Sequence, residues 1–231
     1  TFDQNFKYNL IIRRTLDGVV KSYPGDRTTD DFQKFMVYTK KVWFANGIHH
    51  HYSNDKFVPG FSAEFFKQLV VDSDYKTLPL TGNQKKEELA DEIIPIMFDP
   101  TLYPKKVESK KGEDLVAKSA SNFYEGVTMS EVNAYYQSKV DPNDTTPVSY
   151  GLNTKVIKEN GAVKEIPWTL DGMYGKAIKR IIYWLEKAKT VAENETQAKE
   201  FDLLIKYYQT GDLEVWDEYN VLWAGNTDVK I

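Results

Sequence analysis

The sequence predicts an α+β protein that is predominantly helical, with a small β-sheet that includes a hairpin at about residues 152–168. Apolar residues recur every three or four positions over several long segments, which is the period of a helix buried on one face. One pair of short segments flanks Asn160-Gly161, and this dipeptide is the strongest short-range signal for a two-residue hairpin turn. The chain has 231 residues, 41% hydrophobic and 28% charged, so it should fold into one or two domains.

The first predicted helix begins at Thr28, which can cap its first turn together with Asp31, and it should end near Asn46-Gly47. Its predicted buried face comprises Phe32, Phe35, Met36, Thr39, Val42 and Trp43. An extended loop over residues 46–61 should follow, and Ser62 is the predicted cap of the next helix.

Later segments alternate between helical patterns and breakers. Asn83 can cap a third helix, which Pro95 should kink or stop, and residues 99–112 should be irregular. Thr128 and Glu131 form a capping box before a fourth helix. The hairpin strands are predicted at Leu152–Glu159 and Ala162–Trp168.

Three helices are predicted in the last quarter of the chain. One runs from Met173 to about Val191, and a second contains Phe201 to Tyr208. Gly211 separates a last helix, whose aromatic stripe is interpreted as packing in a core or between domains rather than as a ligand surface. The stripe consists of Trp216, Tyr219 and Trp223.

Composition excludes several classes of function. The 34 acidic and 30 basic residues give a net charge of −4 without a basic stripe, so we expect no nucleic-acid partner. No stretch reaches the roughly 18 apolar residues of a membrane helix, so no membrane partner is expected. The absence of cysteine excludes disulfides and thiolate ligands but leaves the compartment open. Because the chain begins at Thr1 and ends abruptly at Ile231, we expect residues 1–231 to be a single fragment of a longer protein.

The three histidines of the chain are consecutive: His49, His50 and His51. Neighbouring side chains point about 100° apart in a helix and to opposite faces in a strand, so only two of the three can converge easily. Asp55, or Asn54 through its carbonyl oxygen, could add a metal ligand. A histidine-rich loop that contacts a partner or substrate is favoured instead, so no metal site and no catalytic residue is assigned.

Aromatic and apolar residues surround the histidines in the sequence, which argues against a loop that is simply solvated. The apolar residues around the histidines are Trp43, Phe44, Ile48, Tyr52, Phe57 and Phe61. A cluster of this size predicts that a partner surface covers it. No Gly-x-Ser-x-Gly elbow and no phosphate-binding glycine loop occurs in the sequence, so serine hydrolases and nucleotide binders have no support.

The stretch Lys40–Pro59, which contains Trp43-Phe44-Ala45-Asn46-Gly47-Ile48-His49-His50-His51-Tyr52, resembles dipeptidyl peptidase III, particularly its Bacteroidetes members. Similarity continues at residues 122–130, 185–189 and 209–214 and around Trp223. It extends from about Thr28 to the end of the chain and is strongest at residues 40–59 and 183–231.

The resemblance implies a two-lobed zinc exopeptidase that releases N-terminal dipeptides from oligopeptides. The HExxGH helix of that family does not occur in this sequence. The resemblance therefore implies part of the substrate-binding, non-zinc lobe, which holds no cofactor and is inactive alone. Its partners would be a short peptide and the missing lobe that bears the zinc of the parent enzyme. The alternative is a self-standing, non-catalytic peptide- or protein-binding domain.

The resemblance also implies a set of substrate-binding residues. Lys56–Pro59 is similar to the loop that lines the family's cleft, so Phe57 is the candidate for packing against the N-terminal residues of the peptide. His51, Tyr52 and Asn54 are its candidate companions.

Overall fold

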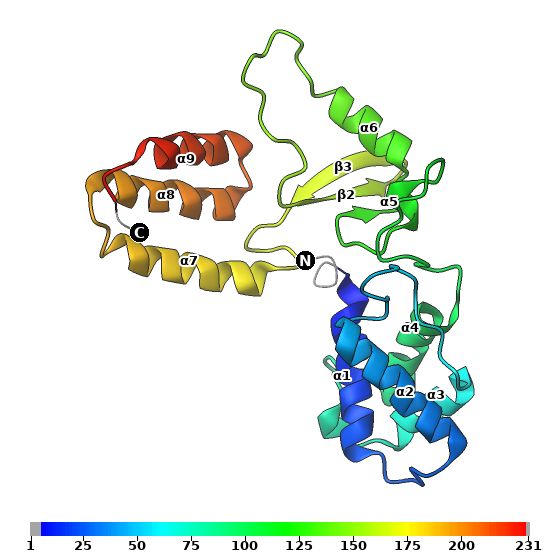
Figure 1. Ribbon diagram of the computed structural model, residues 1–231. Helices are drawn as coiled ribbons and strands as arrows, with labels where there is room; N and C mark the ends of the chain where they lie inside the picture. Colours follow the sequence, from blue (N-terminus) through cyan, green and yellow to red (C-terminus); the bar gives the residue numbers. More distant parts are fainter. Residues whose placement is uncertain (1–5, 230–231) are drawn as a thin grey trace. The chain divides into compact units, whose positions relative to one another are not determined.

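The computed structural model describes residues 6–229 and confirms the predicted α+β class, predominantly helical with a small sheet (Figure 1). The chain divides into two compact units, Thr1–Asn122 and Phe123–Ile231. None of the helices in the part of the chain that the structure describes is both long and apolar enough to cross a membrane.

The first unit is built from helices. They are α1 (Lys7–Ser22), α2 (Asp30–Ala45), α3 (Ala63–Asp72), the 3₁₀-helix η2 (Tyr75–Thr77), α4 (Lys86–Phe98) and the short α5 (Leu115–Lys118). Helices α3 and α4 pack against each other, and α1 contacts α2, α3 and α4. Their shared core includes the fully buried Phe35, Phe66, Ile12, Leu16 and Ile93.

Helix α1 was not predicted from the sequence. Its buried residues Ile12, Leu16 and Val19 have helical spacing, but Phe6 precedes the helix and provides no side-chain cap. Because the start lacks a capping residue, the pattern alone did not mark this segment as a helix.

Helix α2 follows its prediction closely. Thr29, rather than Thr28, caps it by accepting a hydrogen bond from the Phe32 amide at 3.3 Å, and Asn46 ends it in the left-handed region with φ 56°. The buried face consists of Phe32, Phe35, Tyr38, Thr39, Val42 and Ala45. Met36 and Trp43, which were predicted on that face, are only partly buried. The opposite face is exposed to solvent.

Helix α4 differs from the prediction at its start, and it passes through Pro95 before it ends where the irregular segment was predicted to begin. Lys85 rather than Asn83 is the N-cap residue, and its amide donates to the Glu88 carboxylate at 3.0 Å. Pro95 lies inside the helix, which continues to Phe98. Burial of Ile93, Ile96 and Met97 on both sides of the proline stabilises a turn that local preference would end.

The second unit combines a three-stranded sheet with four helices in its described part. The elements are β1 (Tyr124–Glu125), α6 (Met129–Gln137), β2 (Thr154–Glu159), β3 (Ala162–Pro167), α7 (Gly175–Lys189), α8 (Glu195–Thr210) and α9 (Leu213–Gly225). Strand β2 is central, parallel to β1 and antiparallel to β3. Helix α6 contacts β3, while α8 packs between α7 and α9 (Figure 1).

The predicted hairpin is confirmed. Glu159 pairs with Ala162 across the turn, and Asn160 and Gly161 have φ values of 52° and 81°. Positive φ at both central positions is what a type I′ turn requires.

The aromatic stripe of α9 is divided between core and surface. Trp216 and Tyr219 pack beside Tyr207 of α8, with 4.8 Å between the Trp216 and Tyr207 ring centroids. Trp223 is 60% exposed. Interpretation of the stripe as core therefore holds for the first two residues only.

The capping box of α6 gives the second unit an acid-sensitive element. Hydrogen bonds from Lys158 and from the amide and hydroxyl of Thr128 lower the pKa of Glu131 to about 2. Since the pKa is depressed in the folded state, this stabilisation is complete above the ordinary value of 4.5 and is lost as pH falls toward 2. We expect wild type to lose more thermal stability than Glu131→Gln between pH 6 and pH 3, measured by circular dichroism. Parallel losses in the two proteins would contradict this.

Candidate functional site

Within the predicted loop between α2 and α3, residues 48–57 fold back as a small hairpin. The Phe57 amide donates to the Ile48 carbonyl at 2.8 Å, and the His50 amide donates to the Asp55 carbonyl at 2.7 Å. Asn54 closes the turn in the left-handed region with φ 63°, and its amide donates to the His50 carbonyl at 3.0 Å. The turn therefore holds His50 and Phe57 in fixed positions on its two arms.

The three histidines occupy three different environments. His49 is fully buried, with Nε2 2.9 Å from the Tyr103 carbonyl. The Nδ1 of His50 accepts hydrogen bonds from the Tyr52 and Ser53 amides, both at 3.2 Å. The His51 ring stacks on that of His50 at 4.8 Å. Two of the three side chains therefore converge, and they are neighbours in the sequence, which the tight turn allows and a regular strand would not.

The described residues do not offer a zinc site. Within residues 6–229, no group of three or more histidine, aspartate and glutamate side chains could hold a metal ion. The histidine run supplies two neighbouring imidazoles and a third that is directed into the core. No step of chemistry can be derived through zinc from these side chains.

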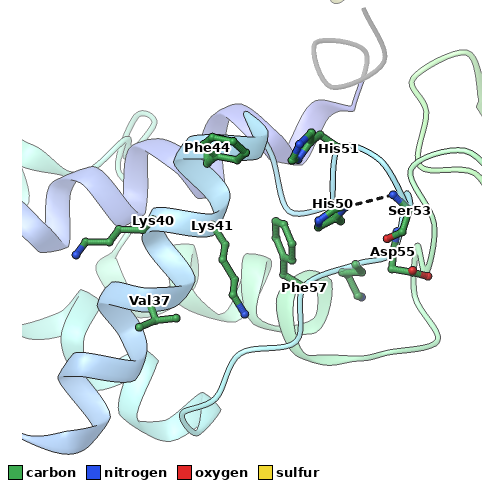
Figure 2. A pocket seen from close by; sticks show the side chains of 10 residues that line it. Val37, Lys40, Lys41, Phe44, His50, His51, Ser53, Asp55 and Phe57 are labelled. Carbon is green, nitrogen blue, oxygen red and sulfur yellow. Dashed lines mark hydrogen bonds between the residues drawn. The ribbon is translucent and has the colours of Figure 1, made fainter.

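A pocket of about 660 Å³ lies between the exposed face of α2 and the histidine loop. It is lined by Val37, Lys40, Lys41, Phe44, His50, His51, Ser53, Asp55, Lys56 and Phe57. Figure 2 shows the side chains of the helix on one side of this space and those of the loop on the other. Both elements are part of the first unit, so the pocket is complete within it.

Two of the four predicted substrate-binding residues line this pocket. Phe57 and His51 do, and the His51 ring also contacts Phe44, with 5.0 Å between centroids. Tyr52 does not line it and is 82% exposed, with its ring 4.2 Å from that of His51. Asn54 shapes the turn instead, and its carbonyl accepts a hydrogen bond from the Lys106 amide at 2.8 Å.

The sequence patterns missed the helical wall of the pocket. Val37, Lys40, Lys41 and Phe44 recur at intervals of three and four and therefore share one face of α2. Of these, only Phe44 was among the predicted aromatic surroundings. The signal available in the sequence was an apolar pair, Val37 and Phe44, on the face opposite to the core.

A second hollow of about 380 Å³ continues the pocket along the same helix. It is lined by Asp30, Gln33, Lys34, Val37, Tyr38, Lys41, Val58 and Gly60. The two hollows share Val37 and Lys41 as lining residues, and together they are called the α2 groove below. From Asp30 to Phe44 the helix rises by about 20 Å, which matches about six residues of an extended peptide.

Lys56 fixes the arm of the loop that carries Phe57. Its ammonium donates to the carbonyl oxygens of Ile96 in the last turn of α4 and of Asp99 and Leu102 in the segment that follows, the first at 3.0 Å. Burial lowers the pKa of Lys56, while the charge of Asp99 opposes the shift. A cation here satisfies carbonyls that the end of a helix leaves unpaired.

The other charges that line the groove are mostly compensated. Asp55 pairs with Lys105, whose hydrogen bond holds the pKa of the Asp55 carboxyl below its ordinary value. Lys34 pairs with Asp30 at 2.6 Å. Among the described residues, neither Lys40 nor Lys41 forms an ion pair, although the Lys41 ammonium lies 6.0 Å from the Phe57 ring centroid. The charge left uncompensated in the groove is therefore positive.

Comparison with known families places a match in the other unit. The sequence model of peptidase family M49, the family of dipeptidyl peptidase III, matches residues 149–230. Residues 149–230 are therefore similar to the M49 peptidases. No curated protein matches the chain. The M49 match covers the hairpin β2-β3 and helices α7 to α9 and overlaps the resemblance at residues 183–231, whereas residues 40–59 and the α2 groove lie outside it.

Proposed function

We propose that this chain is the peptide-binding part of a zinc-dependent dipeptidyl peptidase, and that an oligopeptide lies in the α2 groove. The observation that carries the proposal is the groove itself, which is long, open and partly apolar. The M49 match at residues 149–230 supports the class of reaction. HExxGH does not occur in the sequence. In this proposal the zinc is held by a part of the parent enzyme outside residues 1–231, and this chain binds peptide without cleaving it.

Exposed apolar side chains along the groove favour an extended peptide as the occupant. Val37, Phe44 and Val58 are all exposed although large and apolar, and Phe44 is 80% exposed. Such a cluster in water marks a binding surface. An extended peptide would place alternate side chains against these residues and Phe57, which contacts the His50 ring edge to face at 6.0 Å between centroids.

The Phe57→Ala variant tests the proposal. Loss of one aromatic wall should weaken binding of an oligopeptide about tenfold, which corresponds to about 1.4 kcal/mol. The measurement is isothermal titration of the 231-residue chain with acetylated, amidated hexapeptides. Tyr75→Ala is the matched control, because Tyr75 is an exposed aromatic residue of the same unit, 54% exposed on η2.

Unchanged affinity in Phe57→Ala, or a loss as large in Tyr75→Ala, would overturn the assignment of the groove. A separate observation decides between the parent enzyme and the self-standing binding domain. If the natural reading frame continued beyond Ile231 without encoding HExxGH, the binding domain would be favoured and the peptidase proposal would fail.

A further inference from the structure

We propose that the α2 groove selects peptides that carry a carboxylate, which Lys41 binds with support from Lys40, next to an apolar side chain that contacts Phe57. This inference rests on the proposed function, because it assumes that the groove binds a peptide. It adds the chemical class of that peptide and the residues that recognise it.

The charge balance of the groove is the first argument. Its two lining aspartates, Asp30 and Asp55, each have a lysine partner. Lys56 is a cation, but three carbonyl oxygens already surround its ammonium. The ammonium groups of Lys40 and Lys41 remain to attract a ligand, and they require an anion.

The position of these lysines is the second argument. Lys41 lines both hollows, so its side chain stands where the two hollows meet, one helical turn from Val37 and close to one from Phe44. Figure 2 shows Lys41 beside Phe57, facing the loop, whereas Lys40 extends along the outer side of the helix. Lys41 is therefore the direct partner of a carboxylate, and Lys40 adds positive potential at the rim.

His50 adds a ring N–H donor to the same wall. Its Nδ1 accepts the Tyr52 and Ser53 amides, so in the neutral ring the proton is on Nε2. A carboxylate, which only accepts hydrogen bonds when ionised, can use both an ammonium and an imidazole N–H. The N-terminal ammonium of a peptide can use neither and would be repelled by Lys41.

This charge pattern changes the expected direction of the peptide. The family resemblance implies that Phe57 packs against the N-terminal residues of the substrate. With Lys41 6.0 Å from the Phe57 ring centroid, the segment beside Phe57 is better matched by an acidic side chain or by the C-terminal carboxylate. Both sources present the same chemical group, so peptides that contain one or the other must be compared.

Four hexapeptides separate these sources in titrations of the intact chain. Three are acetylated and amidated, Ala-Phe-X-Phe-Ala-Ala, with glutamate, glutamine or lysine at X. The fourth has glutamine at X and a free C-terminal carboxylate. We expect at least one carboxylate peptide to bind about tenfold more tightly than the amidated glutamine peptide, and the lysine peptide to bind most weakly. A glutamate preference identifies a side chain as the source, and a preference for the free carboxylate identifies the C-terminus.

Variants show which cation is responsible. Lys41→Gln should reduce the carboxylate preference to about twofold or less, and Lys40→Gln should reduce it less. Lys76→Gln, a change of an exposed lysine on η2, should preserve it. Equal binding of carboxylate and amide peptides by wild type, with both lost in Phe57→Ala, would overturn this inference and leave the peptide groove standing. No binding of any peptide would overturn both.

Discussion

The Phe61→Ala variant should lose about 3–5 kcal/mol of unfolding free energy in the first unit. Phe61 is only 6% exposed and is the centre of an aromatic cluster that joins α2, α3 and α4. Its ring centroid lies 5.7 Å from those of Phe35 and Phe98 and 5.8 Å from that of Tyr38, in edge-to-face contacts. Removal of the ring would leave a cavity between three helices and would loosen the segment that carries Phe57.

Urea denaturation, monitored by hydrogen exchange of the backbone amides in α2 and α4, measures this loss of unfolding free energy. Because these amides report on the first unit alone, the measurement holds even if the two units unfold separately. Phe44→Ala is the matched control, because its ring is largely in water, and it should change stability by less than about 0.5 kcal/mol. Similar losses in the two variants would show that Phe61 is not the centre of this core.

The Lys56→Met variant should destabilise the same unit by about 2–4 kcal/mol, because it leaves three carbonyl oxygens at the end of α4 without a donor. Methionine preserves most of the volume of the buried lysine stem, so the loss reports the hydrogen bonds rather than a cavity. Exchange of the amides in the last turn of α4 and in residues 55–58 should accelerate most.

Lys67→Met serves as the comparison for Lys56→Met. Lys67 pairs with Asp91 at 2.6 Å on the surface of the same unit, and both side chains are largely exposed. A surface ion pair contributes about 0–1 kcal/mol, so Lys67→Met should cost far less. If Lys56→Met proved as mild as Lys67→Met, the helix end would be hydrated and Lys56 would not position Phe57.

Local signals predicted most of the fold. The positive φ values of Asn160 and Gly161 follow from residue type alone, and the end of α2 at Asn46 does as well. Tertiary contacts decide where a local signal leaves alternatives open. Pro95 should kink or stop α4, and buried side chains on both sides let the helix continue past it to Phe98.

The groove could be predicted only in part, because its wall depends on long-range contacts. Phe57 and His51 were predicted only because Lys56–Pro59 and its neighbours resemble the cleft loop of the dipeptidyl peptidase III family. No local pattern links Lys56 to carbonyl groups some 40 residues away or Asp55 to Lys105. Without those pairings, the sequence could not show which charges are compensated, and it did not single out Lys40 and Lys41 as binding residues.

The most direct test of the central claim is a titration of the ¹⁵N-labelled chain with the acetylated, amidated glutamate hexapeptide, in which the backbone amide chemical shifts are measured at each peptide concentration. The account predicts that the largest changes occur at residues 37–44 and 50–58, and that Lys41→Gln weakens them. Changes confined to residues 123–229, or no saturable change at all, would contradict the claim that the α2 groove binds peptides.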